Sequence, residues 1–288
     1  MGHILGIIGG SGLYALDGLE DVREVRVDTP YGPPSDALIR GRLDEIELVF
    51  LPRHGRSHHL TPTEVPYRAN IWAMKSLGVG WILSASAVGS LREAIAPGHL
   101  VVIDQFIDRT RARPSTFFGD GCVAHVGFGD PVCGVLAAYL FEAATEVGGT
   151  TVHKGGTYVA MEGPAFSTRA ESELYRSWGA SVIGMTNLPE AKLAREAEIS
   201  YATLAMATDW DCWREGHDDV TVAQVLGVLR ENAARARQIV AAVARRVAGH
   251  PGPAPQHDAL STAIITPVGA IPEPARERLR PIIGKYLS

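Results

Sequence analysis

Short apolar runs recur along the chain at lengths that suit β-strands, with helix-like segments between several of them. The runs cover residues 4–8, 46–51, 81–83, 100–103, 182–184 and 201–207. The helix-like segments cover residues 69–77, 169–178 and 189–197, and Pro189 stands where a first helical turn tolerates proline. This alternation predicts an α/β fold: a single domain with a central mixed, largely parallel twisted sheet flanked by helices.

The longest helix is predicted over residues 222–247, where Val, Leu, Ile and Ala recur at helical spacing. Its other face is rich in arginine, so the apolar stripe indicates packing against the core and not a partner surface. The proline-rich residues 250–256 are interpreted as a linker, after which residues 263–287 regain an apolar run and a helix-like end. We therefore expect a domain over 1–248, followed by a Pro-rich linker and C-terminal arm over 249–288.

Composition and charge narrow the class of protein. With 46% hydrophobic and 20% charged residues, the 288-residue chain is typical of a soluble globular protein with a full core. The net charge of −5 favours neither nucleic acid nor a membrane as a partner, so any bound anion must be held by a local pocket. Three cysteines without C-x-x-C spacing argue against disulfides or a zinc site. With no signal peptide and no long apolar run, a cytoplasmic enzyme is the default expectation.

Arg53 and His54 are the first candidate ligand-binding residues. They follow the apolar run 46–51, so they would lie at the carboxyl end of a strand, where parallel α/β sheets bind ligands. The guanidinium fork matches phosphate, and the imidazole would add another donor. The alternative is a solvated loop with chance charges.

Residues 9–12, Gly-Gly-Ser-Gly, follow the first predicted strand. Oriented backbone amides in such a turn, together with the Ser11 hydroxyl, could form an anion nest. The turn lacks G-x-G-x-x-G spacing and a ribose-binding acid about 20 residues later, which disfavours a dinucleotide-binding oxidoreductase. A structural glycine turn without a ligand remains open.

Three further loops offer weaker signals. Residues 84–90 supply small side chains and hydroxyls, although such clusters are usually plain turns. Phe166 stands in a turn over residues 162–167 and suits either a ring-stacking wall or the core. Thr186 precedes a predicted helix, where its hydroxyl can contact an anion or simply cap the helix.

Asp209 and Asp211 lie two residues apart after the run 201–207, with Trp210 and Trp213 beside them. Lone aspartates at strand ends are usually caps or turn formers. Paired acids among large apolar rings could instead face a heteroaromatic base, one accepting from an exocyclic amine and one serving a ring nitrogen. No Ser-His-Asp order, metal-ligand pattern or Walker loop competes with this site.

Nine segments form an ordered set along nearly the whole chain: GIIGGSGL, DTPYGPPSDAL, PRHGRSH, YRANIWAMK, GSLREAI, IDQFIDRT, EGPAFSTRAES, MTNLPEAKLARE and ATDWDCW. In these segments the chain resembles the methylthioadenosine phosphorylases of the trimeric purine nucleoside phosphorylase family. The resemblance implies a purine nucleoside phosphorylase-like fold. It also implies phosphorolysis, in which inorganic phosphate attacks C1′ of the nucleoside and releases adenine and 5-methylthioribose 1-phosphate, a step of purine and methionine salvage.

The resemblance also implies site roles, position by position. Phosphate would be held by Ser11, Arg53, His54, Ser86, Ala87 and Thr186. The nucleoside would contact Met185 under the ribose, Phe166 and Ser167 near the base, Asp209 and Asp211 at N7 and the 6-amino group, His58 and His125 near the sugar, and Val222 at the methylthio group. The family usually has threonine at the Ser11 and Ser86 positions, and serine keeps the hydroxyl. Asn187 departs from the family's threonine-type residue.

Asp209 is the expected catalytic residue, because a leaving purine accumulates negative charge and needs a proton or donor at N7. An aspartate supplies it only when protonated, which burial beside tryptophan and the charge of Asp211 would both favour. Relatives specific for 6-oxopurines have Glu at the Ser167 position and Asn at the Asp209 position. This chain is therefore expected to prefer a 6-aminopurine.

We expect no metal and no organic cofactor, with inorganic phosphate as co-substrate. The resemblance implies a homotrimer or hexamer in which His125 reaches into a neighbouring subunit's site, with no nucleic acid or membrane partner. The alternatives are a phosphorylase that prefers adenosine, deoxyadenosine or a 6-oxopurine nucleoside such as methylthioinosine, a nucleosidase, a nucleotide-binding oxidoreductase, and a non-catalytic binding protein.

Overall fold

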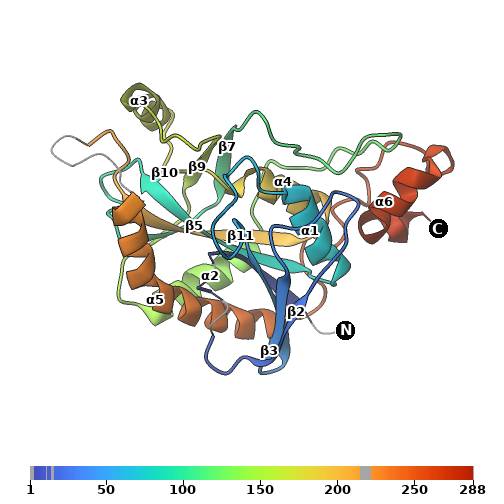
Figure 1. The fold of residues 1–288 in the computed structure, drawn as a ribbon, viewed down its shortest axis with the longest axis horizontal. Coiled ribbons are helices and arrows are strands. Elements are labelled where there is room, and N and C mark those ends of the chain that lie inside the picture. The colour runs from blue at the N-terminus through green and yellow to red at the C-terminus, as the bar shows by residue number, and fades with distance from the viewer. Residues whose placement is uncertain (1–2, 11, 14–15, 215–221, 288) are drawn as a thin grey trace.

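A mixed sheet forms the centre of the computed structural model, which describes residues 3–10, 12–13, 16–214 and 222–287, with only the backbone described over 222–233. Over these residues the sheet has 11 strands. Figure 1 shows it at the centre of the molecule. The strands are β1 Ile4–Gly9, β2 Glu20–Val25, β3 Leu38–Leu43, β4 Ile46–Pro52, β5 Trp81–Ser90, β6 Leu100–Val102, β7 Gln105–Arg109, β8 Val152–Lys154, β9 Thr157–Met161, β10 Val182–Gly184 and β11 Ser200–Asp209.

Most neighbouring strands of this sheet run parallel. The pairs β1–β4, β1–β5, β5–β11, β6–β8, β7–β9 and β9–β10 are parallel. The pairs β2–β3, β3–β4, β5–β10 and β6–β11 are antiparallel. The predicted mixed, largely parallel sheet is therefore confirmed.

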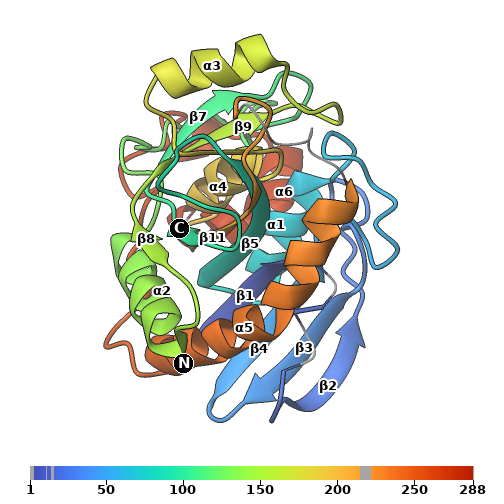
Figure 2. The ribbon, with the colours of Figure 1, turned by 90° about the vertical axis from the view of Figure 1, so that its left-hand side faces the viewer.

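Helices cover both faces of the sheet (Figures 1 and 2). They are α1 Tyr67–Ser76, α2 Gly134–Val147, α3 Arg169–Ser177, α4 Asn187–Glu196, α5 Val222–Ala248 and α6 Glu273–Ile283, with 3₁₀ turns at Val268–Ala270 and Gly284–Tyr286. Successive residues of β1 face opposite layers, because side chains alternate along a strand. Ile7 packs in the core cluster that contains α2 and α5, and Ile8 packs in the cluster that contains α1, α4 and α6.

The structure extends the strand that the sequence predicted over residues 81–83. Residues 84–90, expected to form a turn, continue β5 to Ser90. The hydroxyls that suggested a turn have buried partners instead, and Ser84 Oγ donates to the Glu190 carboxylate at 2.8 Å. A polar strand interior is tolerated here because its hydrogen bonds are satisfied. Helix α6 falls within the helix-like end predicted over residues 263–287. Helix α2 and strands β2, β3 and β7–β9 were not specified by the sequence.

The C-terminal segment packs against the rest of the molecule. Leu279 of α6 is fully buried in the same core cluster as Ile71 of α1. Trp72 Nε1 donates to the Arg278 carbonyl oxygen at 2.9 Å, which ties α1 to α6. Residues 250–256 contain neither helix nor strand. The division at residues 248 and 249 stays a prediction, but the arm shares the core of the preceding residues.

Candidate active site

Strand β5 brings the candidate site residues together. Strand β10 runs antiparallel to β5, with Ile183 opposite Gly89. The chain that leaves β10 therefore continues toward Ser86. Strand β11 runs parallel to β5 and places Asp209 opposite Gly89 after a register shift. The contact between Ser86 and Thr186 and the pairing of Gly89 with Asp209 therefore lie at two different points along β5.

Arg53 lies next to the middle of β5, buried in an ion pair with Glu190. Its Nε and Nη2 donate to the two carboxylate oxygens at 2.8 and 3.1 Å. Nη2 also donates to Ser84 Oγ at 2.6 Å, and Nη1 donates to the Ala85 carbonyl oxygen at 3.1 Å. Burial alone would lower the pKa of Arg53, but the Glu190 carboxylate outweighs it and raises the pKa. The guanidinium therefore stays charged.

The Arg53–Glu190 pair changes what Arg53 can offer to an anion. The sequence suggested a free guanidinium fork, but its Nε–Nη2 edge is already bidentate to Glu190. Among the described residues, Nη1 makes a single hydrogen bond, so this nitrogen is the one left to donate to an oxyanion. Glu190 was missed because an acid in the predicted helix 189–197 could equally have faced solvent.

His54 is neutral and has a fixed tautomer. Its Nδ1 lies 2.8 Å from the Leu60 carbonyl oxygen, which can only accept, so Nδ1 carries the hydrogen. Burial, followed by the charge of Arg53, lowers the pKa of His54 to about 4. At neutral pH its Nε2 is therefore an acceptor, whereas the sequence reasoning expected a further donor. The exposed His58 stacks on the His54 ring with the centroids 4.5 Å apart.

Three buried hydroxyls meet beside Arg53. Ser86 Oγ lies 3.3 Å from Thr186 Oγ1, so these two predicted phosphate residues are brought together. The third hydroxyl belongs to Tyr158 of β9, which lies 3.3 Å from Ser86 Oγ. Ala87 follows Ser86 in β5 and is half-buried. Tyr158 was missed because a tyrosine within an apolar strand is indistinguishable from a core residue in the sequence.

The two aspartates occupy different surroundings. Asp209 Oδ2 accepts from Thr208 Oγ1 at 2.7 Å, and its Oδ1 accepts from the backbone N–H of Asp211 at 2.8 Å. Both oxygens of Asp211 accept from the Ser167 hydroxyl, at 2.9 and 2.8 Å. Burial raises the pKa of both carboxyls, and for Asp209 the nearby Asp211 charge adds to the effect. Both effects shift Asp209 in the direction of its protonated form.

A buried arginine fixes the loop that carries Met185. The Arg113 side chain is fully buried and donates to the Leu188 carbonyl oxygen at 2.9 Å and to the Glu162 side chain at 3.0 Å. Its Nη1 also donates to the Met185 carbonyl oxygen at 2.5 Å. Arg113 therefore connects the loop after β9 to the loop after β10 through hydrogen bonds. No motif identified Arg113 in the sequence, since its partners are mostly backbone carbonyls.

The remaining predicted residues are less closely connected to the site. Phe166 is 48% exposed, next to the Ser167 that bonds Asp211. His125 is exposed and lies in a segment whose backbone pairs with the C-terminal arm, its N–H donating to the Ala263 carbonyl oxygen at 2.9 Å. No hydrogen bond of the described residues joins His125 to this site. Ser11 and the side chain of Val222 lie outside the described residues.

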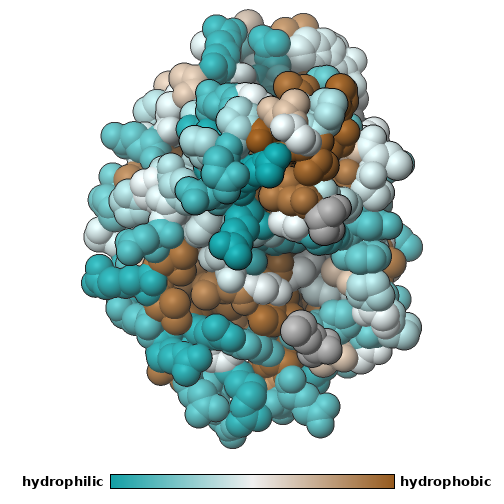
Figure 3. Space-filling view, turned by 90° about the vertical axis from the view of Figure 1, so that its right-hand side faces the viewer, coloured by the Kyte–Doolittle hydropathy of each residue, from teal (hydrophilic) through white to brown (hydrophobic). Residues whose placement is uncertain are grey.

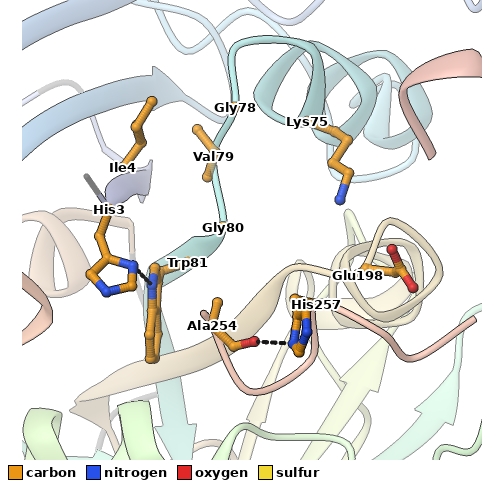
Figure 4. Close-up of a pocket in the computed structure, with 10 residues that line it drawn as sticks. All are labelled: His3, Ile4, Lys75, Gly78, Val79, Gly80, Trp81, Glu198, Ala254 and His257. Carbon is orange, nitrogen blue, oxygen red and sulfur yellow. Dashed lines mark hydrogen bonds between the residues drawn. The ribbon is translucent and has the colours of Figure 1, made fainter. Parts of the chain in front are cut away.

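A cavity of about 200 Å³ lies at the opposite, amino-terminal ends of β1 and β5. Lys75 and His257 line it together with Trp81 (Figure 4). None of the predicted site residues does so. Within the described part of the chain, no group of His, Cys, Asp and Glu has the arrangement of a metal site, and no helix has the length and apolarity to cross a membrane.

The fold and the site define an α/β protein with hydroxyl donors that suit an anion at one point of a strand, and a buried and a partly buried acid at another. A family model described as the phosphorylase superfamily matches residues 4–245. The S-methyl-5'-thioadenosine phosphorylase of Geobacter sulfurreducens is 59% identical over 288 residues, covering 100% of both chains. The chain belongs to the phosphorylase superfamily and, within it, to the family of S-methyl-5'-thioadenosine phosphorylases.

Solved structures agree with this assignment. A methylthioadenosine phosphorylase from an antarctic soil metagenomic library has a TM-score of 0.93 and 48% identity, covering 98% of this chain and 99% of that one. A serine-to-threonine variant of the adenosine/methylthioadenosine phosphorylase of Schistosoma mansoni, solved with methylthioadenosine, has a TM-score of 0.81 and 37% identity. That match covers 86% of this chain and 92% of the other.

Proposed function

We propose that the protein catalyses the phosphorolysis of S-methyl-5'-thioadenosine to adenine and 5-methylthioribose 1-phosphate, which makes it a pentosyltransferase. The observation that carries this proposal is the order along β5, where Ser86 and Thr186 meet at one point and Asp209 lies beside Gly89. Three residues of extended strand span about 10 Å. A nucleoside can lie between an oxyanion and a proton donor at that separation. The full-length relatives of this name support the choice of substrate.

The anion end of this site would bind phosphate for attack on C1′. Ser86 and Thr186 supply hydroxyl donors and Arg53 supplies its Nη1 edge. His54, neutral with an acceptor at Nε2, pairs with the O–H of hydrogen phosphate. Ser11 and Ala87 complete the proposed set. Phosphate held beside C1′ acts both as nucleophile and as counter-charge for an oxocarbenium-like transition state.

The acid end would bind adenine. Asp209, whose pKa is raised by burial, donates a proton to N7 as the glycosidic bond breaks. Asp211, held by Ser167, accepts from the 6-amino group. Met185 would lie under the ribose. Phe166, His58, His125 and Val222 are proposed to contact the base, the sugar and its 5′ substituent.

The test is adenine release from methylthioadenosine with and without phosphate. We expect release to depend on phosphate and the sugar product to be a 1-phosphate. Equal rates without phosphate would indicate a nucleosidase instead. Comparison with adenosine, deoxyadenosine, methylthioinosine and inosine decides the base preference, and faster turnover of the 6-oxopurines would overturn the adenine assignment.

The active protein is also proposed to need no metal or organic cofactor, to be cytoplasmic and to form a homotrimer or hexamer. The three free cysteines support a reducing compartment. Hydrophobic residues gather on the side of the molecule that carries α6 (Figure 3), and Val123, Ile265 and Val268 are exposed. Light scattering of the purified protein tests the assembly, and a monomer would contradict it. Activity that survives EDTA and dialysis tests the absence of a cofactor.

A further inference from the structure

The hydroxyl of Tyr158 lies beside the Ser86 and Thr186 hydroxyls that are assigned to the oxyanion. It is 3.3 Å from Ser86 Oγ, and it accepts the backbone N–H of Thr186 at 3.4 Å. Tyr158 is fully buried, and its ring packs edge-on against Phe106 with the centroids 5.7 Å apart. This third hydroxyl comes from β9, so three separate segments contribute to the cluster.

Gly184 leaves the space that the Tyr158 hydroxyl occupies. A Cβ atom at Gly184 would lie 2.0 Å from the Tyr158 hydroxyl oxygen and 2.6 Å from Cζ, distances that real Cβ atoms do not reach. The absence of a side chain at residue 184 therefore lets the tyrosine reach the start of α4. Burial raises the pKa of Tyr158, so the group is a neutral hydroxyl with one proton to donate.

One hydrogen bond of this cluster has a fixed direction, because a backbone N–H can only donate. Thr186 stands at the N-terminus of α4, where backbone N–H groups have no partner within the helix. That N–H is accepted by Tyr158, which leaves the Tyr158 proton for Ser86 Oγ or Thr186 Oγ1. If Ser86 accepts this proton, its own hydrogen is directed away from Tyr158. That hydrogen is donated to the Ala87 carbonyl oxygen at 3.3 Å, a long hydrogen bond that a bound oxyanion would replace. Each hydrogen bond in such a chain polarises the next one and strengthens the final donor.

We propose that Tyr158 is a positioning residue of the oxyanion site, which relays the helix N-terminal N–H of Thr186 to the Ser86 hydroxyl and so aims that hydroxyl at phosphate. The inference rests on the proposed function, because phosphate is the oxyanion concerned. Tyr158 does not touch the nucleoside in this scheme. Its removal should therefore weaken phosphate binding and leave the nucleoside site intact.

The test is Tyr158→Phe, which keeps the ring and removes the hydroxyl. We expect the KM for phosphate to rise about 10-fold, the loss typical of one buried hydrogen bond in a network. The KM for methylthioadenosine should stay within twofold. Titration of phosphate alone into the protein, followed by calorimetry, should show the same loss of affinity. Tyr139→Phe is the matched control, because it removes a tyrosine hydroxyl bonded to His250 outside the site.

A double-mutant cycle separates relay from simple packing. Once Ser86→Ala removes the end of the chain, adding Tyr158→Phe should change the phosphate KM by less than twofold further. Independent, multiplicative effects would overturn the relay, as would an unchanged phosphate KM in Tyr158→Phe. If the phenylalanine variant does not fold, Tyr158→Met fills the space with a flexible apolar chain and carries the same expectation. A wild-type protein that releases adenine without phosphate contradicts the proposed function, whereas a phosphate-dependent wild type with an unaffected Tyr158→Phe contradicts the relay alone.

Discussion

Asp209 and Asp211 show how two acids of one motif can have different hydrogen-bond partners. Both oxygens of Asp211 are held by the Ser167 hydroxyl, which favours a fixed acceptor. Asp209 accepts from Thr208 and from the Asp211 backbone, and its carboxyl lies over Gly89, where a Cβ atom would be 2.9 Å from Oδ1. Its raised pKa and its place against the strand suit a proton donor.

Replacing Asp209 by asparagine should lower kcat by about 100-fold or more, because general acid catalysis typically contributes 10²- to 10⁴-fold. Asp209 can act as the acid only while it is protonated, and its pKa is raised above the usual 3.8. Activity should therefore fall as the pH rises through that pKa and Asp209 loses its proton. Asparagine does not titrate, and Asp209→Asn should lose this alkaline limb. The pH–rate profiles of both proteins check it, with the exposed Asp258→Asn as control. An alkaline limb that persists in Asp209→Asn would assign the proton to another group.

Glu190 balances a buried positive charge. Arg53 and Glu190 are 3% and 1% exposed, so neither charge is solvated by water. Tyr201 also donates to Glu190, at 2.9 Å. Removing one partner of such a pair leaves the other charge buried without compensation, which is far more costly than the pair itself is stabilising.

Glu190→Gln should therefore destabilise the protein by about 3–5 kcal/mol. Glu196→Gln on the same helix is the matched control: Glu196 is 8% exposed and accepts from Phe117 N–H and the Thr116 hydroxyl, both neutral donors. It should cost about 1–2 kcal/mol. Urea denaturation of the two variants measures the difference. Equal losses would mean that burial of a carboxylate, and not its pairing with Arg53, sets the cost.

At the scale of elements, the sequence predicted the strands whose apolar runs are uninterrupted. It did not predict the features that depend on tertiary contacts. The runs 4–8, 46–51, 182–184 and 201–207 correspond to β1, β4, β10 and β11. Ser84 and Ser86 concealed the length of β5, because the groups that satisfy their hydroxyls lie about 100 residues away. Ser86 and Thr186 were both expected in the site through the resemblance. Tyr158 and Glu190 were not, since neither has a local signature.

Strands β9 and β10 depend on a glycine at their contact. Gly184→Ala should force the Tyr158 ring away and destabilise the protein by about 3 kcal/mol, the upper range of overpacking. The phosphate KM should rise as well. Gly134→Ala at the start of α2 is the control, because its Cβ atom meets nothing within 4 Å and alanine favours a helix. Urea unfolding and phosphate kinetics of both variants check this, and a Gly184→Ala variant as stable as Gly134→Ala would refute the steric argument.

At the scale of the whole molecule, the C-terminal arm behaves as part of the main core. Residues 250–256 contain neither helix nor strand, as the proline-rich sequence predicted. Beyond them Ile271, Leu279 and Ile283 are buried in the cluster shared with α1 and α4. An apolar run on its own indicates burial without naming the partner, so the sequence could not place α6 against α1.

Leu279→Ala should destabilise the entire protein by about 2–5 kcal/mol, because it leaves a cavity in that shared core. Unfolding should remain a single transition when followed by tryptophan fluorescence and by circular dichroism. Leu174→Ala in α3 is the control, since Leu174 is 46% exposed and its loss should cost less than about 0.5 kcal/mol. Two separate transitions in Leu279→Ala would show that the arm melts independently.

The pairing of β5 with both β10 and β11 has a consequence for how this architecture can diverge. Ser86 meets Thr186, and Gly89 meets Asp209, on the same continuous stretch of backbone. In the proposed reaction, the length of that stretch sets the distance between the bound phosphate and the acid that protonates the purine. Insertions are tolerable in the outer loops. One residue added or deleted between 86 and 89 would change the distance between these two contacts and would move the following side chains of β5 to the opposite face of the sheet.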